Sequence, residues 1–118
     1  MTTENLDDIG KGNTLFKIDL EFFNEDGTTK DMTDHLVFMQ FRFGASDGDV
    51  AGDFFIGNGI EWVNQTGGTA KTDQIDELNW AIGTYHYDVR IKQTVESELY
   101  TTTRGTMKVV KIVTKRKA

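Results

Sequence analysis

Apolar and polar side chains alternate one by one in two stretches of the chain, residues 15–23 and residues 84–92. Successive side chains of a β-strand point to opposite faces, so each stretch predicts a strand with one buried and one solvated face. Two strands of this kind are expected to share one core. The expected inward residues are Phe16, Ile18, Leu20 and Phe22 in the first strand and Tyr85, Tyr87, Val89 and Ile91 in the second.

Residues 36–43 differ, because apolar side chains fall on both faces of the predicted strand. Val37, Met39 and Phe41 belong to one row, whereas Leu36 and Phe38 begin the opposite row. A strand that is apolar on both sides is either covered by a loop or presents a contact surface. Leu36 and Phe38 are therefore candidates for a contact face toward a partner.

Glycine-containing turns predict where the remaining strands begin and end. Gly57, Asn58 and Gly59 separate two short apolar runs and predict a tight hairpin turn. Gly105 lies within a long final strand and predicts a β-bulge there. Six or seven short strands without alternating helices predict an all-β domain, built as an antiparallel sandwich or barrel.

One segment, residues 73–80, breaks the strand alternation. Ile75, Leu78 and Ile82 recur at helical spacing, and Asp73 is a residue type that caps helix N-termini. At this length the pattern predicts a short helical turn rather than a packed helix.

The length of 118 residues and the absence of cysteine and proline limit the possible folds. We expect one domain at residues 14–113, between a polar N-terminal arm (1–13) and a basic C-terminal tail (114–118). Without cysteine, disulfide scaffolds, thiolate zinc sites and iron–sulfur clusters are excluded. The apolar runs are short and the first ten residues are polar, so neither a membrane span nor a secretory signal is expected.

Charge is distributed unevenly along the chain. The net charge of −6 combines −12 over residues 1–98 with +6 over residues 99–118, which contain no acidic residue. The basic end either pairs with acidic neighbours and finishes in a solvated tail, or docks onto an acidic partner. Nucleic acid is disfavoured as that partner, because the acidic body would repel phosphates. The candidate tether residues are Lys108, Lys111, Lys115, Arg116 and Lys117.

Catalytic and metal-binding motifs are sparse. The strongest metal candidate is a glycine-containing loop with Asp47, Asp49 and Asp53, whose carboxylates are hard oxygen ligands of the kind that calcium prefers. The loop lacks EF-hand spacing, and a polar hairpin tip is the alternative. His35 follows Asp34, and His86 lies near Asp88 on the polar face of a predicted strand, but neither histidine belongs to a recognisable catalytic motif. We therefore expect a protein that is not an enzyme and that binds no cofactor.

The two tryptophans, Trp62 and Trp80, lie close to apolar residues and are expected to pack in the core. The alternative is a platform on which sugars stack, which requires the two rings to be exposed and coplanar. A carbohydrate-binding β-sandwich module for adhesion to a host surface is therefore the alternative function.

Several short motifs resemble a known family. An early turn, Asp26-Gly27-Thr28, precedes Asp31-Met32-Thr33, and the stretch Gly83-Thr84-Tyr85-His86-Tyr87-Asp88 enters a late strand before Arg104-Gly105. Together these motifs resemble the small immunoglobulin-like domains of bacteriophage virions, including the N-terminal modules of baseplate and tail-fibre adaptor proteins. The resemblance implies an immunoglobulin-like sandwich with a role in particle assembly and no catalytic residues. In such a strand entry a tyrosine can hydrogen-bond back to the preceding corner.

These observations together predict a non-enzymatic structural protein of a bacteriophage virion that acts as an assembly, adaptor or decoration module. Attachment in the tail, baseplate or fibre is favoured over capsid decoration. The expected partners are other virion proteins and further copies of the chain in a homo-oligomer or ring. Membranes and nucleic acid are not expected as partners, and the expected location is the virion, assembled in the host cytoplasm.

Overall fold

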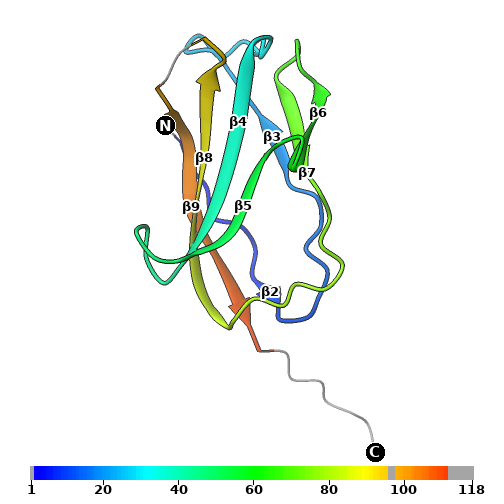
Figure 1. Cartoon of the computed structure of the whole chain (residues 1–118), viewed down its shortest axis with the longest axis vertical. Helices are drawn as coiled ribbons and strands as arrows, with labels where there is room; N and C mark the ends of the chain where they lie inside the picture. The colour runs from blue at the N-terminus through cyan, green and yellow to red at the C-terminus, as the bar shows by residue number, and fades with distance from the viewer. Residues whose placement is uncertain (1, 96–97, 112–118) are drawn as a thin grey trace, which may run out of the picture.

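The computed structural model describes residues 2–95 and 98–111, and this part of the chain is all-β (Figure 1). It contains no helix of the length and apolar character needed to cross a membrane. Its strands are β1 (Thr2–Thr3), β2 (Ile9–Gly10), β3 (Asp19–Glu21), β4 (His35–Phe43), β5 (Val50–Ile56), β6 (Gly59–Asn64), β7 (Thr69–Thr72), β8 (Gly83–Gln93) and β9 (Tyr100–Val110).

All of these strands belong to one mixed, curled sheet. The strand order is β1-β9-β8-β4-β5-β6-β7-β3, and β2 also pairs with β9. Most neighbours are antiparallel, but β1 and β2 run parallel to β9, and β5 pairs in parallel with β6. The curl brings β3, at one end of the order, opposite β8 and β9 across the interior (Figure 1). The predicted all-β class is confirmed, with mixed rather than purely antiparallel strand directions.

Facing rows of side chains from β4 and β8 form the centre of the core. Residues opposite one another on neighbouring strands share a face, so the inward rows of the two strands coincide. The ring centroids of Phe41 and Tyr87, which are opposite each other, lie 5.6 Å apart. The alternation predicted for residues 84–92 is therefore confirmed. The buried members are Val37, Met39 and Phe41 of β4 and Tyr85, Tyr87 and Val89 of β8.

The first alternating stretch forms a strand over only part of its length. Leu20 and Phe22 are buried as expected, but β3 itself spans only Asp19–Glu21. The expectation that Phe16 points inward is wrong, since its side chain is 70% exposed. Just before β3, Leu15 forms an isolated bridge with Ile75, and Leu15 packs against the core in place of Phe16.

The chain makes a jog at Gly57, Asn58 and Gly59 instead of the predicted hairpin turn. Gly57 and Gly59 have φ angles of 93° and 92°, a left-handed conformation that glycine adopts without steric cost. Asn58 N–H donates to the Phe55 carbonyl at 2.8 Å, and Phe55 N–H donates back to the Asn58 carbonyl at 2.9 Å. Because this small loop closes on itself, β6 leaves it parallel to β5 and leads into the β6-β7-β3 end of the sheet.

The helical turn predicted near residues 73–80 is absent from the structure. Leu15 and Ile75 exchange backbone hydrogen bonds of 2.8 and 2.9 Å, and Leu78 N–H donates to the Asn13 carbonyl at 2.9 Å. A helix would need these groups for bonds between residues four positions apart. Leu78 is nevertheless buried in the core, and Ile75 packs against it. The apolar spacing therefore identified inward residues, although the segment that contains them is extended and not helical.

Two tyrosines of β8 hold neighbouring segments through their hydroxyl groups. Tyr85 donates to the Ala81 carbonyl at 2.6 Å and so fixes the corner before β8. Tyr87 donates to the Glu4 carbonyl and ties the N-terminal segment, residues 2–10, to the sheet. The same segment lies along β9, where the N–H of Leu6 donates to the Thr106 carbonyl at 2.9 Å.

Gly105 lies where the N-terminal segment crosses closest to β9. A Cβ at this position would lie 1.9 Å from the Glu4 carbonyl oxygen and 2.9 Å from the Tyr87 ring. Only glycine fits such an approach. The predicted position of the bulge is wrong. The irregularity in β9 lies at Thr102, which is the extra residue between the pairs Val89–Thr103 and Arg90–Thr101.

We expect Gly105→Ala to lower the free energy of unfolding by about 1–3 kcal/mol, the usual cost of overpacking. Thermal melts measure this change, and hydrogen exchange should show lost protection of the Glu4 and Leu6 amides. Gly12→Ala is the control, because Gly12 has a φ of 86° but open space around its Cβ position. It should cost only the backbone penalty and leave Glu4 protected. Undiminished stability in Gly105→Ala would contradict the close contact.

Stability should fall at high pH because of Tyr87. Burial raises the pKa of the Tyr87 hydroxyl to about 12, and the Glu4 charge acts in the same direction. The unfolded chain loses this proton near the ordinary tyrosine pKa of about 10. The contribution of the protonated Tyr87 hydroxyl to folding stability is therefore complete below pH 10 and is lost as the pH rises toward 12. Urea midpoints measured across this window should decline, and less steeply for Tyr87→Phe; equal slopes would sink this assignment.

Candidate functional site

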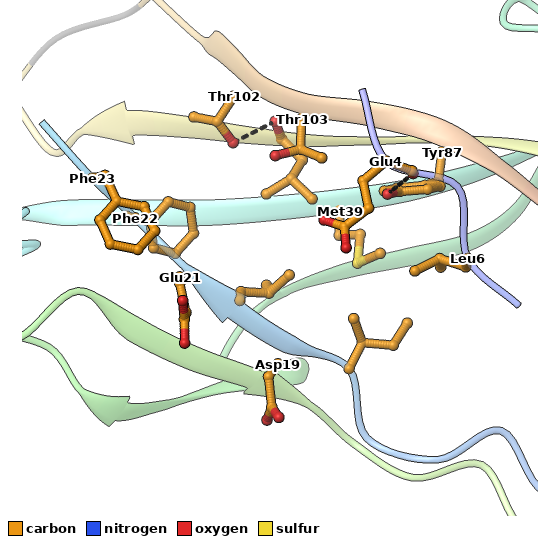
Figure 2. A pocket seen from close by; sticks show the side chains of 13 residues that line it. Glu4, Leu6, Asp19, Glu21, Phe22, Phe23, Met39, Tyr87, Thr102 and Thr103 are labelled. Atoms are coloured by element: carbon orange, nitrogen blue, oxygen red, sulfur yellow. Dashed lines mark hydrogen bonds between the residues drawn. The ribbon is translucent and has the colours of Figure 1, made fainter. Parts of the chain in front are cut away.

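The two ends of the curled sheet do not meet, and a groove of about 400 Å³ lies between them (Figure 2). One wall is the N-terminal segment, and the other is β3 with the residues on either side of it. Met39, Tyr87 and Val89 form the floor, and Thr102 and Thr103 of β9 close one end. The groove is therefore built from both ends of the described chain and from its centre.

β3 presents an unpaired edge to this groove. Within the described chain it pairs only with β7, and it stands last in the strand order. Alternate residues bond toward β7: the Ile18 carbonyl accepts from the Thr72 N–H at 2.9 Å, and the Phe22 N–H donates to the loop before β7 at 2.8 Å. In an antiparallel pair the intervening residues point their N–H and C=O groups the other way. The backbone of Asp19 and Glu21 therefore faces the open edge.

Three carboxylates surround the groove, and its described lining contains no lysine, arginine or histidine. Figure 2 shows the Glu4 carboxylate between the β8–β9 layer and β3, whereas Asp19 and Glu21 project from the opposite side of β3. The two ion pairs found among the described residues involve Glu61 and Asp88 instead. The groove thus combines a negative rim with a largely apolar floor.

An open strand edge beside a groove is the geometry of strand addition, in which an extended peptide continues the sheet. The free backbone groups of Asp19 and Glu21 offer the hydrogen bonds, and the floor accepts apolar side chains. Charges on an edge strand also suppress pairing with unsuitable strands. An acidic edge rejects acidic strands, so the arrangement selects an extended peptide that carries positive charge.

The structure places Leu36 and Phe38 on the outer face of β4, both partly buried. Phe38 lies opposite Phe55 of β5 on one side and Arg90 of β8 on the other. Phe55 is 41% exposed, so Leu36, Phe38 and Phe55 form an apolar surface that we call the outer patch. Its role as a contact face stays a prediction.

The basic candidates lie at and beyond the end of β9. Lys108 and Lys111 are exposed, and Lys108 alternates with the buried Met107 and Val109. The tail, residues 114–118, lies outside the described residues, and with it Lys115, Arg116 and Lys117. Docking of these residues onto an acidic partner stays a prediction.

The structure does not gather Asp47, Asp49 and Asp53 into a metal site. Asp47 and Asp49 are exposed in the loop between β4 and β5. Asp53 lies within β5, on the outer face of the sheet, where it accepts a hydrogen bond from the Gln40 amide at 3.3 Å. Across residues 2–95 and 98–111, no group of three or more histidine, aspartate and glutamate residues is arranged to hold a metal ion.

The two tryptophans occupy different environments. The Trp80 ring centroid lies 5.2 Å from those of both Phe41 and Tyr85. The indole also covers Gly52, where a Cβ would come within 2.8 Å of it. Trp62 is partly buried on β6 and packs against the core from its margin. Trp80 is therefore held in an aromatic cluster, and this packing disfavours its use as a sugar platform.

A second hollow, of about 390 Å³, lies on the outer face of β4, β8 and β9. Its lining includes Arg42, Arg90 and Arg104, and one of these cations, Arg90, pairs with Asp88 at 2.9 Å. The remaining cations give this outer hollow a charge opposite to that of the groove.

Sequence patterns did not reveal the groove. Its walls come from residues 4–6 and 18–23, which no local motif connects. The available signal was the pair Asp19 and Glu21 on the polar face of a predicted strand. That pattern is equally typical of a strand that is simply solvated, and it does not show which strand ends the sheet.

No protein-family model matches the chain, and a search of the curated proteins finds no match. Among solved structures, the chain is similar to part of a family 123 glycoside hydrolase from Clostridium perfringens, analysed for glycolipid glycan hydrolysis, with a TM-score of 0.38 and 13% identity. The similarity covers 96% of this chain and 24% of that one, so the chain spans about a quarter of its length. At this TM-score the similarity carries no argument about function.

Trp80→Ala should lower the free energy of unfolding by about 3 kcal/mol, because it empties a site packed on Phe41 and Tyr85. Trp62→Ala, the matched variant at the core margin, should cost clearly less. Urea denaturation followed by circular dichroism measures both. Glycan binding that Trp80→Ala abolishes without loss of stability would contradict the structural role and favour a carbohydrate-binding module.

Proposed function

We propose that the protein is a non-enzymatic structural protein of a bacteriophage particle, and that it serves as an assembly, adaptor or decoration module. Its place is in the tail, baseplate or fibre attachment rather than on the capsid. Its partners are other virion proteins, including further copies of itself, and its location is the virion.

The proposal includes the finer description of the fold as an immunoglobulin-like sandwich. In this description β9, β8 and β4 form one layer, β6, β7 and β3 form the other, and β5 passes between them. The curl of the sheet supports it, as does the hydrogen bond from Tyr85 to the corner at Ala81. Tyr85 and Tyr87 belong to the motif that resembles phage virion domains, and both hold the chain together here.

One observation carries the proposed function: the groove is bordered by the free edge of β3. Hydrogen-bonding groups that point out of a sheet beside an apolar floor suit the binding of another chain. The rim offers carboxylates but no described cation beside them. Such a surface recognises an extended basic segment by shape and charge, which is the task of an assembly module. The outer patch provides a second contact surface.

The variant Asp19→Lys/Glu21→Lys tests this function. Both side chains are exposed, so the fold should be kept while the rim loses its attraction for basic segments. When it replaces the parent protein in the phage that encodes it, we expect at least a tenfold drop in copies per purified particle. Quantitative immunoblots of particles measure the drop, and melting curves check the fold.

Asp7→Lys/Asp8→Lys is the matched control, with the same charge change on exposed residues outside the groove lining. It should be incorporated normally. Equal incorporation of both variants would contradict the assignment of the groove. Immunogold labelling that finds the parent protein on no particle would contradict the proposed function itself.

A further inference from the structure

The groove and the basic end of the chain are complementary in charge. Glu4, Asp19 and Glu21 surround the groove without a described cation in its lining. Residues 111–117 contain four basic residues and no acidic one. Their sequence, Lys-Ile-Val-Thr-Lys-Arg-Lys, also has the β-branched residues that favour an extended strand. The chain thus contains a segment with the properties that the groove selects.

The spacing of the charges also matches. Asp19 and Glu21 are two residues apart on one side of β3, and so are Lys115 and Lys117 in the basic segment. On a strand beside β3, Lys115 and Lys117 can face this pair, because opposed residues share a face. The intervening Arg116 then points to the groove side.

The side chains of such a strand that point into the groove would meet groups of matching charge and polarity. The Glu4 carboxylate lies on that side in Figure 2, within the space that Arg116 would enter. Ile112 and Thr114 share the face of Arg116, since side chains alternate along a strand. They would lie over the floor, where Met39 and Val89 offer apolar surface.

The basic segment cannot lie along the groove of its own chain. The groove is level with residues 102–106 of β9, because it is lined by Thr102 and Thr103 and by Leu6, which bonds Thr106. From Val110 back to Thr106 the distance is about 13 Å, at ~3.3 Å per residue. A reversal needs about two residues, and four more cover this distance. Only Lys117 would then reach the near end, so a basic segment that fills the whole groove comes from another copy.

A second copy of β3 does not suit the same edge. Two β3 strands brought side by side would place Asp19 and Glu21 of one copy against the same acidic residues of the other. Like charges directly opposite one another destabilise a strand pair. The edge therefore favours the basic segment over a symmetric pairing of two identical edges.

We propose that residues 111–117 of one copy add as a strand to the β3 edge of a second copy and fill its groove. The inference rests on the proposed function, for which it names the partner at the same site. Each copy then gives one segment and accepts another, which is a head-to-tail contact. Such contacts build a ring where the rotation closes and a filament where it does not.

Sedimentation velocity of the full chain tests the proposal over a range of concentrations. The parent should associate as its concentration rises, and more weakly in 500 mM than in 50 mM NaCl, because the contact is ionic. Asp19→Lys/Glu21→Lys reverses the rim, and Lys115→Glu/Arg116→Glu/Lys117→Glu reverses the segment. Each should weaken association at least tenfold while the melting temperature stays close to that of the parent.

Rescue separates this contact from a general charge effect. Mixing the two reversed variants should restore association, since each groove then meets a segment of opposite charge. A single chain carrying both reversals should also associate with itself. Asp7→Lys/Asp8→Lys, introduced into the segment-reversed chain, is the control: it adds the same positive charge but leaves an acidic groove facing an acidic segment, so it should restore nothing.

The remaining outcomes overturn the proposal. They are a parent that stays monomeric at every concentration, association that is indifferent to segment reversal, and failure of the mixed variants to associate. A monomeric parent whose incorporation into particles still depends on Asp19 and Glu21 would leave the proposed function standing, with a basic segment of another virion protein as the occupant.

Discussion

The contact between the Glu4 backbone and Gly105 fixes one wall of the groove and determines what surrounds it. A side chain at position 105 would displace the N-terminal segment and leave β9 as an uncovered edge. Tyr87 strengthens the same joint from β8, because its hydroxyl binds the Glu4 carbonyl while its ring packs near Phe41. The groove therefore depends on a junction between the two ends of the described chain, and the carboxylate of Glu4 is placed in it as a result.

The two edges of the sheet differ in how they are protected from pairing with other strands. The edge of β9 is covered by a segment that runs parallel to it, whereas the edge of β3 stays open and carries Asp19 and Glu21. A covered edge has no free backbone groups for another strand to bind. An edge that carries charged side chains stays open and can still pair with strands of opposite charge. The outer hollow on β4, β8 and β9, which is lined by arginines, lies on a different face. The protein therefore carries positive charge on one face and negative charge around the groove on another.

The alternation of apolar and polar residues was sufficient to predict the inward side chains of strands at the centre of the core. It failed where a pairing with a distant segment decides which side chain points inward. The row of Tyr85, Tyr87 and Val89 was correct because β8 is paired along both sides. Phe16 was wrong because Leu15 pairs with Ile75, a contact that no local pattern contains. The sequence also suggested the basic segment and the outer patch as contact surfaces, and both roles stay predictions. The groove was not predictable, since an open edge is a property of the complete strand order.

The course of β9 has a mechanical meaning. The chain enters the basic end directly from β9, which is hydrogen-bonded to β8 along most of its length. Tension applied at Lys111 would pull β9 along its own axis, across ladder bonds that stand perpendicular to the strand. In that direction the bonds share the force and must rupture together, whereas a pull across the sheet would unzip them in sequence. A domain anchored by this end is thus oriented to withstand being pulled.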